Sequence, residues 1–243
     1  MGRPQRMLEL AAAPRSPGGP RALSPADGSQ SELFELPRRL PHGLVYRPQF
    51  ITRSEEAALL AAIARLPFRE ARFQQYVARR RVVHFHADGD VDTEDAYDDG
   101  ESFSSGPVPP FLAALQQRVA DAFGVARSDL AHTLISEYRP GAPIGWHRDR
   151  STYGVVFGLS LKGRGTMRFR PIDARVELRQ TLALELEPRS LYVMQGPIRW
   201  LWQHSMPPAR ELRYSITFRT RANEGAGDCR TVARNFLSQR HSA

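Results

Sequence analysis

The sequence predicts an α+β fold in which two helices precede a double-sheet β core of the jelly-roll kind. Two observations predict it. Two segments with helical spacing of apolar residues come first, and seven short apolar-rich segments separated by Gly, Pro and Asp follow from residue 131 onward. A chain of 243 residues can bury one domain core. We expect a flexible Pro/Gly/Ala-rich tail over residues 1–40, a domain over 41–222 and a C-terminal tail over 223–243.

Both helices are predicted from residues typical of helix ends and from apolar residues at helical spacing. After a short strand within residues 42–51, Thr52 to Glu55 has capping-box spacing, apolar residues then recur at helical intervals, and Pro67 ends the helix. The second helix starts at the Val108-Pro109-Pro110 run and ends at Gly124. We assign residues 41–130 to these helices and a substrate lid, and residues 131–222 to the β core.

The strands are predicted from alternation and from their turn residues. Residues 75–86 alternate and place basic side chains in mid-strand. The later segments with strand character are 133–138, 153–161, 166–170, 176–186, 191–195, 201–205 and 212–220.

Charge and composition narrow the class of protein. The formal net charge is +8, and Lys162 is the one lysine, so arginine carries the excess. Residues 88–101 hold eight acidic side chains and no basic ones, which leaves +16 (34 minus 18) for the rest of the chain. A polyanion such as nucleic acid is the partner that this charge favours. The single cysteine, Cys229, excludes internal disulfides, and no apolar run is long enough for a membrane span.

A His-x-Asp motif follows a turn-rich run at residues 139–143. In an extended chain, His147 and Asp149 point to the same side, and His204 is the one later histidine ahead of the C-terminal tail. Two histidines and a carboxylate on one side form the facial triad that holds non-haem Fe(II) and leaves coordination positions open. A rival metal pair is His84 and His86 on one strand face, although two such histidines more often line a cleft.

The acidic segment has a partial calcium-loop pattern. Asp88, Asp90 and Asp92 alternate as in an EF-hand, but Thr93 stands where that loop needs glycine. A solvated lid is the better interpretation.

The segment 212–220 alternates cleanly. Arg213, Ser215, Thr217 and Arg219 share one face, and Tyr214, Ile216 and Phe218 share the other, which must lie on a core. Inward arginines need anionic partners, and a dicarboxylate would satisfy two of them. The alternative is an exposed edge strand with its arginines in water.

These motifs resemble the AlkB family of Fe(II)- and 2-oxoglutarate-dependent dioxygenases, chiefly over Ser136 to Arg219. The resemblance implies a double-stranded β-helix (jelly-roll) core. It also implies that His147, Asp149 and His204 hold Fe(II), and that 2-oxoglutarate and O2 are co-substrates. Arg213 and Tyr138 would bind the distal carboxylate of 2-oxoglutarate, Arg219 would bind the carboxylate beside the keto group, and Ser215 belongs to the same motif. Ser136 replaces the family's Asn, so that contact is altered or lost.

The same resemblance implies oxidative demethylation of N-alkylated bases, as in DNA or RNA repair, with release of succinate, carbon dioxide and an aldehyde. The base would be single-stranded or flipped out of a duplex. Ser151 replaces the acidic residue with which the bacterial repair enzymes read the base, so a tRNA-base-modifying or protein-directed dioxygenase stays open. A nucleic-acid-binding domain with a vestigial iron site is a further alternative. Candidate substrate contacts are Tyr76, Arg81, Tyr97 and Trp146. We expect a monomer in the cytoplasm, with association with the nucleoid as a further option, and no membrane partner.

Overall fold

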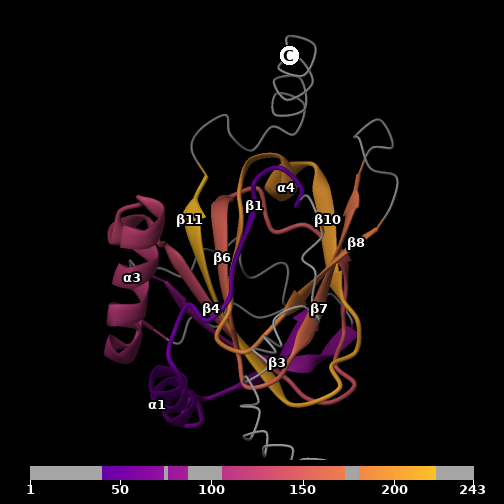
Figure 1. Cartoon of the computed structure of the whole chain (residues 1–243). Helices are drawn as coiled ribbons and strands as arrows, with labels where there is room; N and C mark the ends of the chain where they lie inside the picture. The colour runs from indigo at the N-terminus through magenta and orange to yellow at the C-terminus, as the bar shows by residue number, and fades with distance from the viewer. Residues whose placement is uncertain (1–39, 74–75, 87–105, 173–180, 223–243) are drawn as a thin grey trace, which may run out of the picture. The chain divides into compact units, whose positions relative to one another are not determined.

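Figure 1 shows the computed structural model of the chain, which describes residues 40–73, 76–86, 106–172 and 181–222. These residues belong to the unit that spans Leu36–Ala243. The predicted N-terminal tail up to residue 39, the acidic segment 88–101 and the C-terminal tail from residue 223 lie outside the described residues.

Two antiparallel sheets form the core of the described chain. The larger sheet has the strand order β1 (Leu44–Arg47), β9 (Leu191–Met194), β6 (Tyr153–Leu161), β11 (Arg213–Arg221), β4 (His132–Tyr138), β3 (Tyr76–His86) and β2 (Arg69–Phe73). The smaller sheet has the order β5 (Ile144–His147), β10 (Trp202–Met206), β7 (Gly165–Pro171) and β8 (Leu182–Leu186). Strands distant in sequence are thus neighbours in space, which is the double-stranded β-helix that the sequence predicts.

Helices cover the outer face of the larger sheet. In Figure 1, α1 (Arg53–Ile63) and α3 (Ala113–Phe123) lie on the side of β4, β6 and β11 away from the smaller sheet. Their buried side chains, such as Ile63 and Val119, join one core with Phe157 of β6 and Phe218 of β11. A second core lies between the sheets and includes Val156, Met167 and Trp202. The functional side chains of β11 therefore face the space between the sheets, because its apolar residues face the helices.

Most predicted elements are confirmed, with shifted ends. The strand expected within 42–51 is only β1, and of the strand expected over 176–186 the described part is β8. The helix from residue 108 begins as a 3-10 turn at Pro110–Leu112, and Gly124 ends α3 with a positive φ of 65°. The sequence did not predict β2, the short 3-10 turn Arg127–Asp129 or α4 (Gly196–Trp200). The strand expected at 201–205 starts one residue later, since α4 occupies the preceding residues.

The start of α1 confirms the predicted capping box. Thr52 Oγ1 accepts a hydrogen bond from Glu55 N at 3.2 Å, and Glu55 Oε2 accepts one from Thr52 N at 2.8 Å. Arg118 of α3 donates to both carboxylate oxygens of Glu55, at 3.1 Å to Oε2. Chiefly because of Arg118, the pKa of Glu55 falls from 4.5 to about 2. One carboxylate thus caps α1 and ties it to α3.

We expect Glu55→Gln to destabilise the protein in a pH-dependent way. A carboxyl group whose pKa is lower in the folded state stabilises the fold above its unfolded pKa, and that stabilisation is lost as the pH falls through the folded pKa. The gap in unfolding free energy between wild type and variant should be below about 1 kcal/mol at neutral pH, because the pair is partly exposed. It should shrink between pH 4.5 and about 2. Urea denaturation of both proteins along a pH series measures it, and a gap that does not change with pH contradicts the prediction.

Candidate active site

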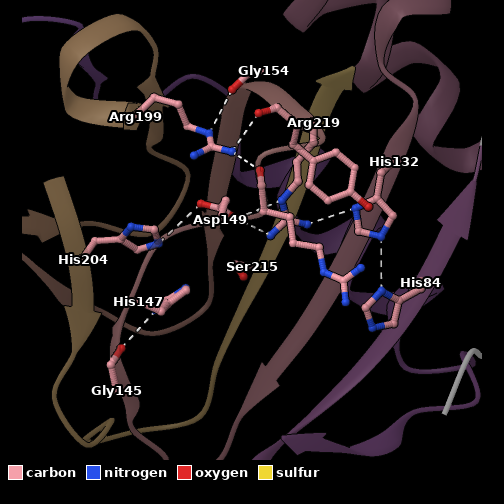
Figure 2. Close-up of polar contacts among 12 residues, drawn as sticks. His84, His132, Gly145, His147, Asp149, Gly154, Arg199, His204, Ser215 and Arg219 are labelled. Atoms are coloured by element: carbon pink, nitrogen blue, oxygen red, sulfur yellow. Dashed lines mark hydrogen bonds and ion pairs between the residues drawn. The ribbon is translucent and has the colours of Figure 1, made fainter. Parts of the chain in front are cut away.

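The predicted metal ligands come together between the two sheets. β5 and β10 are antiparallel neighbours in which His147 and His204 are directly opposite, and the centres of their imidazole rings lie 4.2 Å apart. Asp149 follows β5, and its Oδ2 lies 3.5 Å from His204 Nε2. Figure 2 shows the three side chains on one side of the strands, as the His-x-Asp spacing predicts. Two neutral imidazoles and a carboxylate are a donor set that suits Fe(II).

The electrostatics keep both histidines in the form that can bind a metal. Burial lowers the pKa of His204 to about 3 and also lowers the pKa of His147. His147 Nδ1 lies 3.0 Å from the carbonyl oxygen of Gly145, so Nδ1 carries the proton and donates it to that oxygen. The Nε2 lone pair of His147 is then the one available for a metal, and the hydrogen bond fixes the orientation of the ring.

Asp149 is held by Arg219. The Nε and Nη2 groups of Arg219 donate to Asp149 Oδ1 at 3.0 and 2.8 Å. Burial alone would raise the pKa of Asp149, but Arg219, His204, Arg199 and His147 together outweigh it and hold that pKa far below its ordinary value. Oδ1 is therefore the oxygen that Arg219 occupies. Oδ2 is the oxygen that faces His204.

Arg213 is a buried cation that faces the same space. It is 1% exposed, and its Nε donates to Ser160 Oγ at 3.1 Å, while its Nη1 lies 3.7 Å from Met206 Sδ. No carboxylate of the described residues is within ion-pair distance of it. A buried guanidinium without an anion costs free energy, so the fold retains a charge that an anionic ligand would compensate.

The remaining predicted co-substrate residues surround Arg213. The ring centre of Tyr138 lies 5.0 Å from the Arg213 guanidinium carbon, and Tyr138 Oη lies 3.4 Å from Ser215 Oγ. Burial raises the pKa of Tyr138, but Arg213 and Arg80 reverse the shift and lower it. Ser136 Oγ is buried without a hydrogen-bond partner. All four residues line one cavity that also contains the three predicted metal ligands. We name it the inner cavity, and a dicarboxylate fits its donors.

A second, outer cavity adjoins the triad. It shares Arg80, Leu134, His147, Asp149 and Arg219 with the inner cavity and adds residues that include His84, His132 and Tyr153. Of the two histidines proposed as a rival metal pair, His84 lines this cavity and His86 packs 4.8 Å, ring centre to ring centre, from His132. These two histidines therefore contribute to the polar lining and packing around the outer cavity.

The two candidate substrate contacts that the structure describes with their side chains, Arg81 and Trp146, line neither cavity. Arg81 is held by Glu137 through two 2.8 Å hydrogen bonds. Trp146 is packed 4.4 Å, ring centre to guanidinium carbon, beneath Arg170 of β7. Tyr97 and the side chain of Tyr76 lie outside what the structure describes.

Gly158 leaves room for Tyr192, which lines the inner cavity. The two residues are paired across β6 and β9, and a Cβ on Gly158 would overlap the phenol ring of Tyr192. We expect Gly158→Ala to destabilise the fold by about 1–3 kcal/mol, which is the usual cost of overpacking. It should also weaken 2-oxoglutarate binding, because the displaced ring moves toward the cavity. Thermal melting and calorimetric titration measure both effects. Gly145→Ala is the control, because its added Cβ meets no atom within 4 Å, and equal losses in both variants contradict the prediction.

Three site residues were not predicted from the sequence. His132 is 3% exposed and links Arg219 to His84, but β4 is buried along its whole length, so no alternation marks it. Arg80 could have been found, because in the Arg79-Arg80-Arg81 run one side chain must face inward. Arg199 of α4 donates to the carbonyl oxygens of Arg150, Tyr153 and Gly154, at 2.7 Å to Tyr153 and 3.0 Å to Gly154, and so holds the loop after Asp149 (Figure 2).

Comparison with known proteins agrees with the resemblance of the sequence motifs. The family model described as "2OG-Fe(II) oxygenase superfamily" matches residues 43–219. The "Alkylated DNA repair protein ALKBH8 homolog" of Arabidopsis thaliana is 29% identical over 68% of this chain and 51% of its own length. The "tRNA (carboxymethyluridine(34)-5-O)-methyltransferase alkbh8" of Xenopus tropicalis is 25% identical over 70% of this chain and 26% of its own. The chain therefore spans about half and about a quarter of these two relatives.

The fold is also found in a solved structure. "The structure of OsALKBH1" aligns with a TM-score of 0.56 at 14% identity, over 75% of this chain and 100% of that one. In the part of the chain that the structure describes, no helix has the length and apolarity to cross a membrane.

Proposed function

Because this chain belongs to the 2OG-Fe(II) oxygenase superfamily and is an AlkB-like 2-oxoglutarate-dependent dioxygenase, we propose that it oxidatively demethylates N-alkylated bases in nucleic acid. Buried Arg213, without a carboxylate partner and in the same cavity as His147, Asp149 and His204, is the observation that carries the co-substrate part. The basic charge of +8 and the printed name of the Arabidopsis relative support the nucleic-acid part.

The roles of the residues follow from their positions. His147, His204 and Asp149 Oδ2 would hold Fe(II), which supplies the activation of O2 when bound. Arg213, Tyr138 and Ser136 would bind the distal carboxylate of 2-oxoglutarate. Arg219 is close enough to Asp149 to orient it and to bind the other carboxylate. Burial of the cavity excludes water from the reacting atoms.

The overall reaction balances with these components. One oxygen atom of O2 enters succinate as 2-oxoglutarate loses CO2, and the other enters the N-methyl C–H bond. The two two-electron oxidations reduce O2 by four electrons. The resulting N–CH2OH group loses formaldehyde, and the base nitrogen regains its proton.

The test is mass spectrometry of nucleosides after methylated DNA and RNA have been incubated with the protein, Fe(II), 2-oxoglutarate and ascorbate. We expect a methylated nucleoside to decrease and succinate to form with it, and neither to occur with His147→Ala. Succinate without loss of any methylated nucleoside would overturn the demethylation. No succinate with any substrate would overturn the co-substrate assignment as well.

A second candidate is modification of a tRNA base without demethylation. It is favoured by the relative from Xenopus tropicalis, whose printed name refers to carboxymethyluridine in tRNA. The same experiment distinguishes the two, because a modified uridine would gain one oxygen atom in mass and lose no carbon.

A further inference from the structure

The outer cavity has an inward cation that no described carboxylate neutralises. β3 carries three consecutive arginines, and strand alternation sends them to opposite faces. Arg81 is on the outward face, where it pairs with Glu137, and Arg79 is exposed. Arg80 points the other way, lines both the inner and outer cavities, and has no hydrogen bond or ion pair with any described residue. It is aligned with Tyr138 across β3 and β4.

The other charged residues that line the outer cavity do not neutralise the positive charge of Arg80. Asp149 is its one described acidic residue, and Arg219 already pairs with it at 2.8 Å. Arg148 and Arg150 also line the cavity and have partners of their own. Among the described residues, a positively charged group that entered here would meet Arg80 without a free carboxylate to offset it.

The directions of the hydrogen bonds in the outer cavity add a second constraint on what can bind there. Arginine can only donate, so His132 Nδ1 must accept from Arg219 Nη1, which lies 3.0 Å away. His132 Nε2 then carries the proton and donates to His84 Nδ1 at 3.2 Å. His84 in turn carries its own proton on Nε2. The chain of bonds that starts at Asp149 therefore reaches His84, which lines the outer cavity and has a further partner of its own (Figure 2). Arg80 in the same cavity can only donate, so it favours a base that offers hydrogen-bond acceptors.

We infer that the outer cavity selects a neutral or anionic base with hydrogen-bond acceptors on its edge, and that Arg80 is a specificity-determining residue that rejects positively charged alkylated bases. This inference rests on the proposed demethylase function. N3-methyluracil fits it, because that base is neutral and has a carbonyl oxygen on each side of the methylated nitrogen. N3-methylcytosine is the matched opposite, since methylation at the same ring nitrogen makes it a cation.

The test uses two single-stranded oligonucleotides that differ only in this base. We expect kcat/KM for the N3-methyluracil strand to exceed that for the N3-methylcytosine strand by at least about tenfold. Arg80→Gln should lower kcat/KM for the neutral base by about tenfold and reduce or reverse the preference. Arg79→Gln should change neither, because it removes the same charge from the neighbouring exposed position. The dissociation constant of 2-oxoglutarate should be the same in all three proteins.

Several results would overturn the inference. One is equal or faster turnover of the cationic base. Another is the same loss in Arg79→Gln as in Arg80→Gln, which would make the effect one of surface charge. Weaker 2-oxoglutarate binding in Arg80→Gln would assign the residue to the co-substrate.

A binding measurement separates this inference from the proposed function. Both oligonucleotides are titrated without oxygen, with Fe(II) and 2-oxoglutarate bound, so turnover is not needed. If neither base is demethylated, the proposed function fails for both of these bases. Tighter binding of the neutral strand, abolished by Arg80→Gln, would still support the selectivity, and equal binding would contradict it.

Discussion

Replacing Arg213 with glutamine is expected to weaken 2-oxoglutarate binding by at least about 100-fold. Removing one partner of a buried charge pair costs roughly 2–5 kcal/mol, and 1.4 kcal/mol corresponds to tenfold in affinity. Arg213 is fully buried beside Tyr138 and Ser136, so water cannot replace its contacts with a carboxylate. Isothermal titration of 2-oxoglutarate into the wild type and the variant measures the loss directly.

Although Arg213→Gln should weaken 2-oxoglutarate binding, it should not reduce the stability of the ligand-free protein. Because Arg213 has no anionic partner among the described residues, its replacement removes a buried uncompensated charge and should not lower the melting temperature. Arg164→Gln is the control, since Arg164 is an exposed arginine paired with Glu187, and its affinity for 2-oxoglutarate should be unchanged. An Arg213→Gln variant with a lower melting temperature and an unchanged affinity for 2-oxoglutarate would show that the guanidinium is structural.

Loss of either His147 or Asp149 should abolish turnover, but only the loss of Asp149 should also destabilise the fold. Both side chains are predicted metal ligands, so succinate formation should fall by more than about 1,000-fold in either alanine variant, in line with other groups essential to catalysis. Asp149→Ala leaves the buried guanidinium of Arg219 without its carboxylate, which costs about 3–5 kcal/mol. A domain of this size loses about 2–4 °C of melting temperature per kcal/mol, so a drop on the order of 10 °C is expected.

His147→Ala is the matched control for this effect, because His147 makes no ion pair with Arg219. Its melting temperature should stay within a few degrees of the wild type when no metal is present. The double variant Asp149→Ala/Arg219→Met should regain most of the stability without regaining activity. Equal destabilisation by His147→Ala and Asp149→Ala would contradict the proposed role of the Arg219 pair.

The sequence was most informative where one face of a strand is apolar. In β11, the apolar Ile216 and Phe218 had to face a core, and this alone directed Arg213 and Arg219 inward. β4 is buried on both faces, so its pattern could not show that His132 and Ser136 face the cavities. Ser136 was selected only through the family resemblance.

Most of the features that the sequence could not predict depend on how the strands pair. The placement of His147 opposite His204 depends on the register between β5 and β10, which are far apart in the sequence. β5 has only four residues, and α4 has five, so neither has enough length for a periodic pattern. β2 mixes charged and apolar residues because it is the edge strand of the larger sheet.

The contacts of Arg199 have a consequence for protein engineering. The loop that follows Asp149 is fastened to α4 by hydrogen bonds from one side chain to main-chain oxygens, and α4 leads directly into the strand of His204. Main-chain acceptors are present whatever residues the loop carries. A loop grafted from a relative could therefore differ in every side chain and still be held, provided that its length is preserved and Arg199 is transplanted or kept with it.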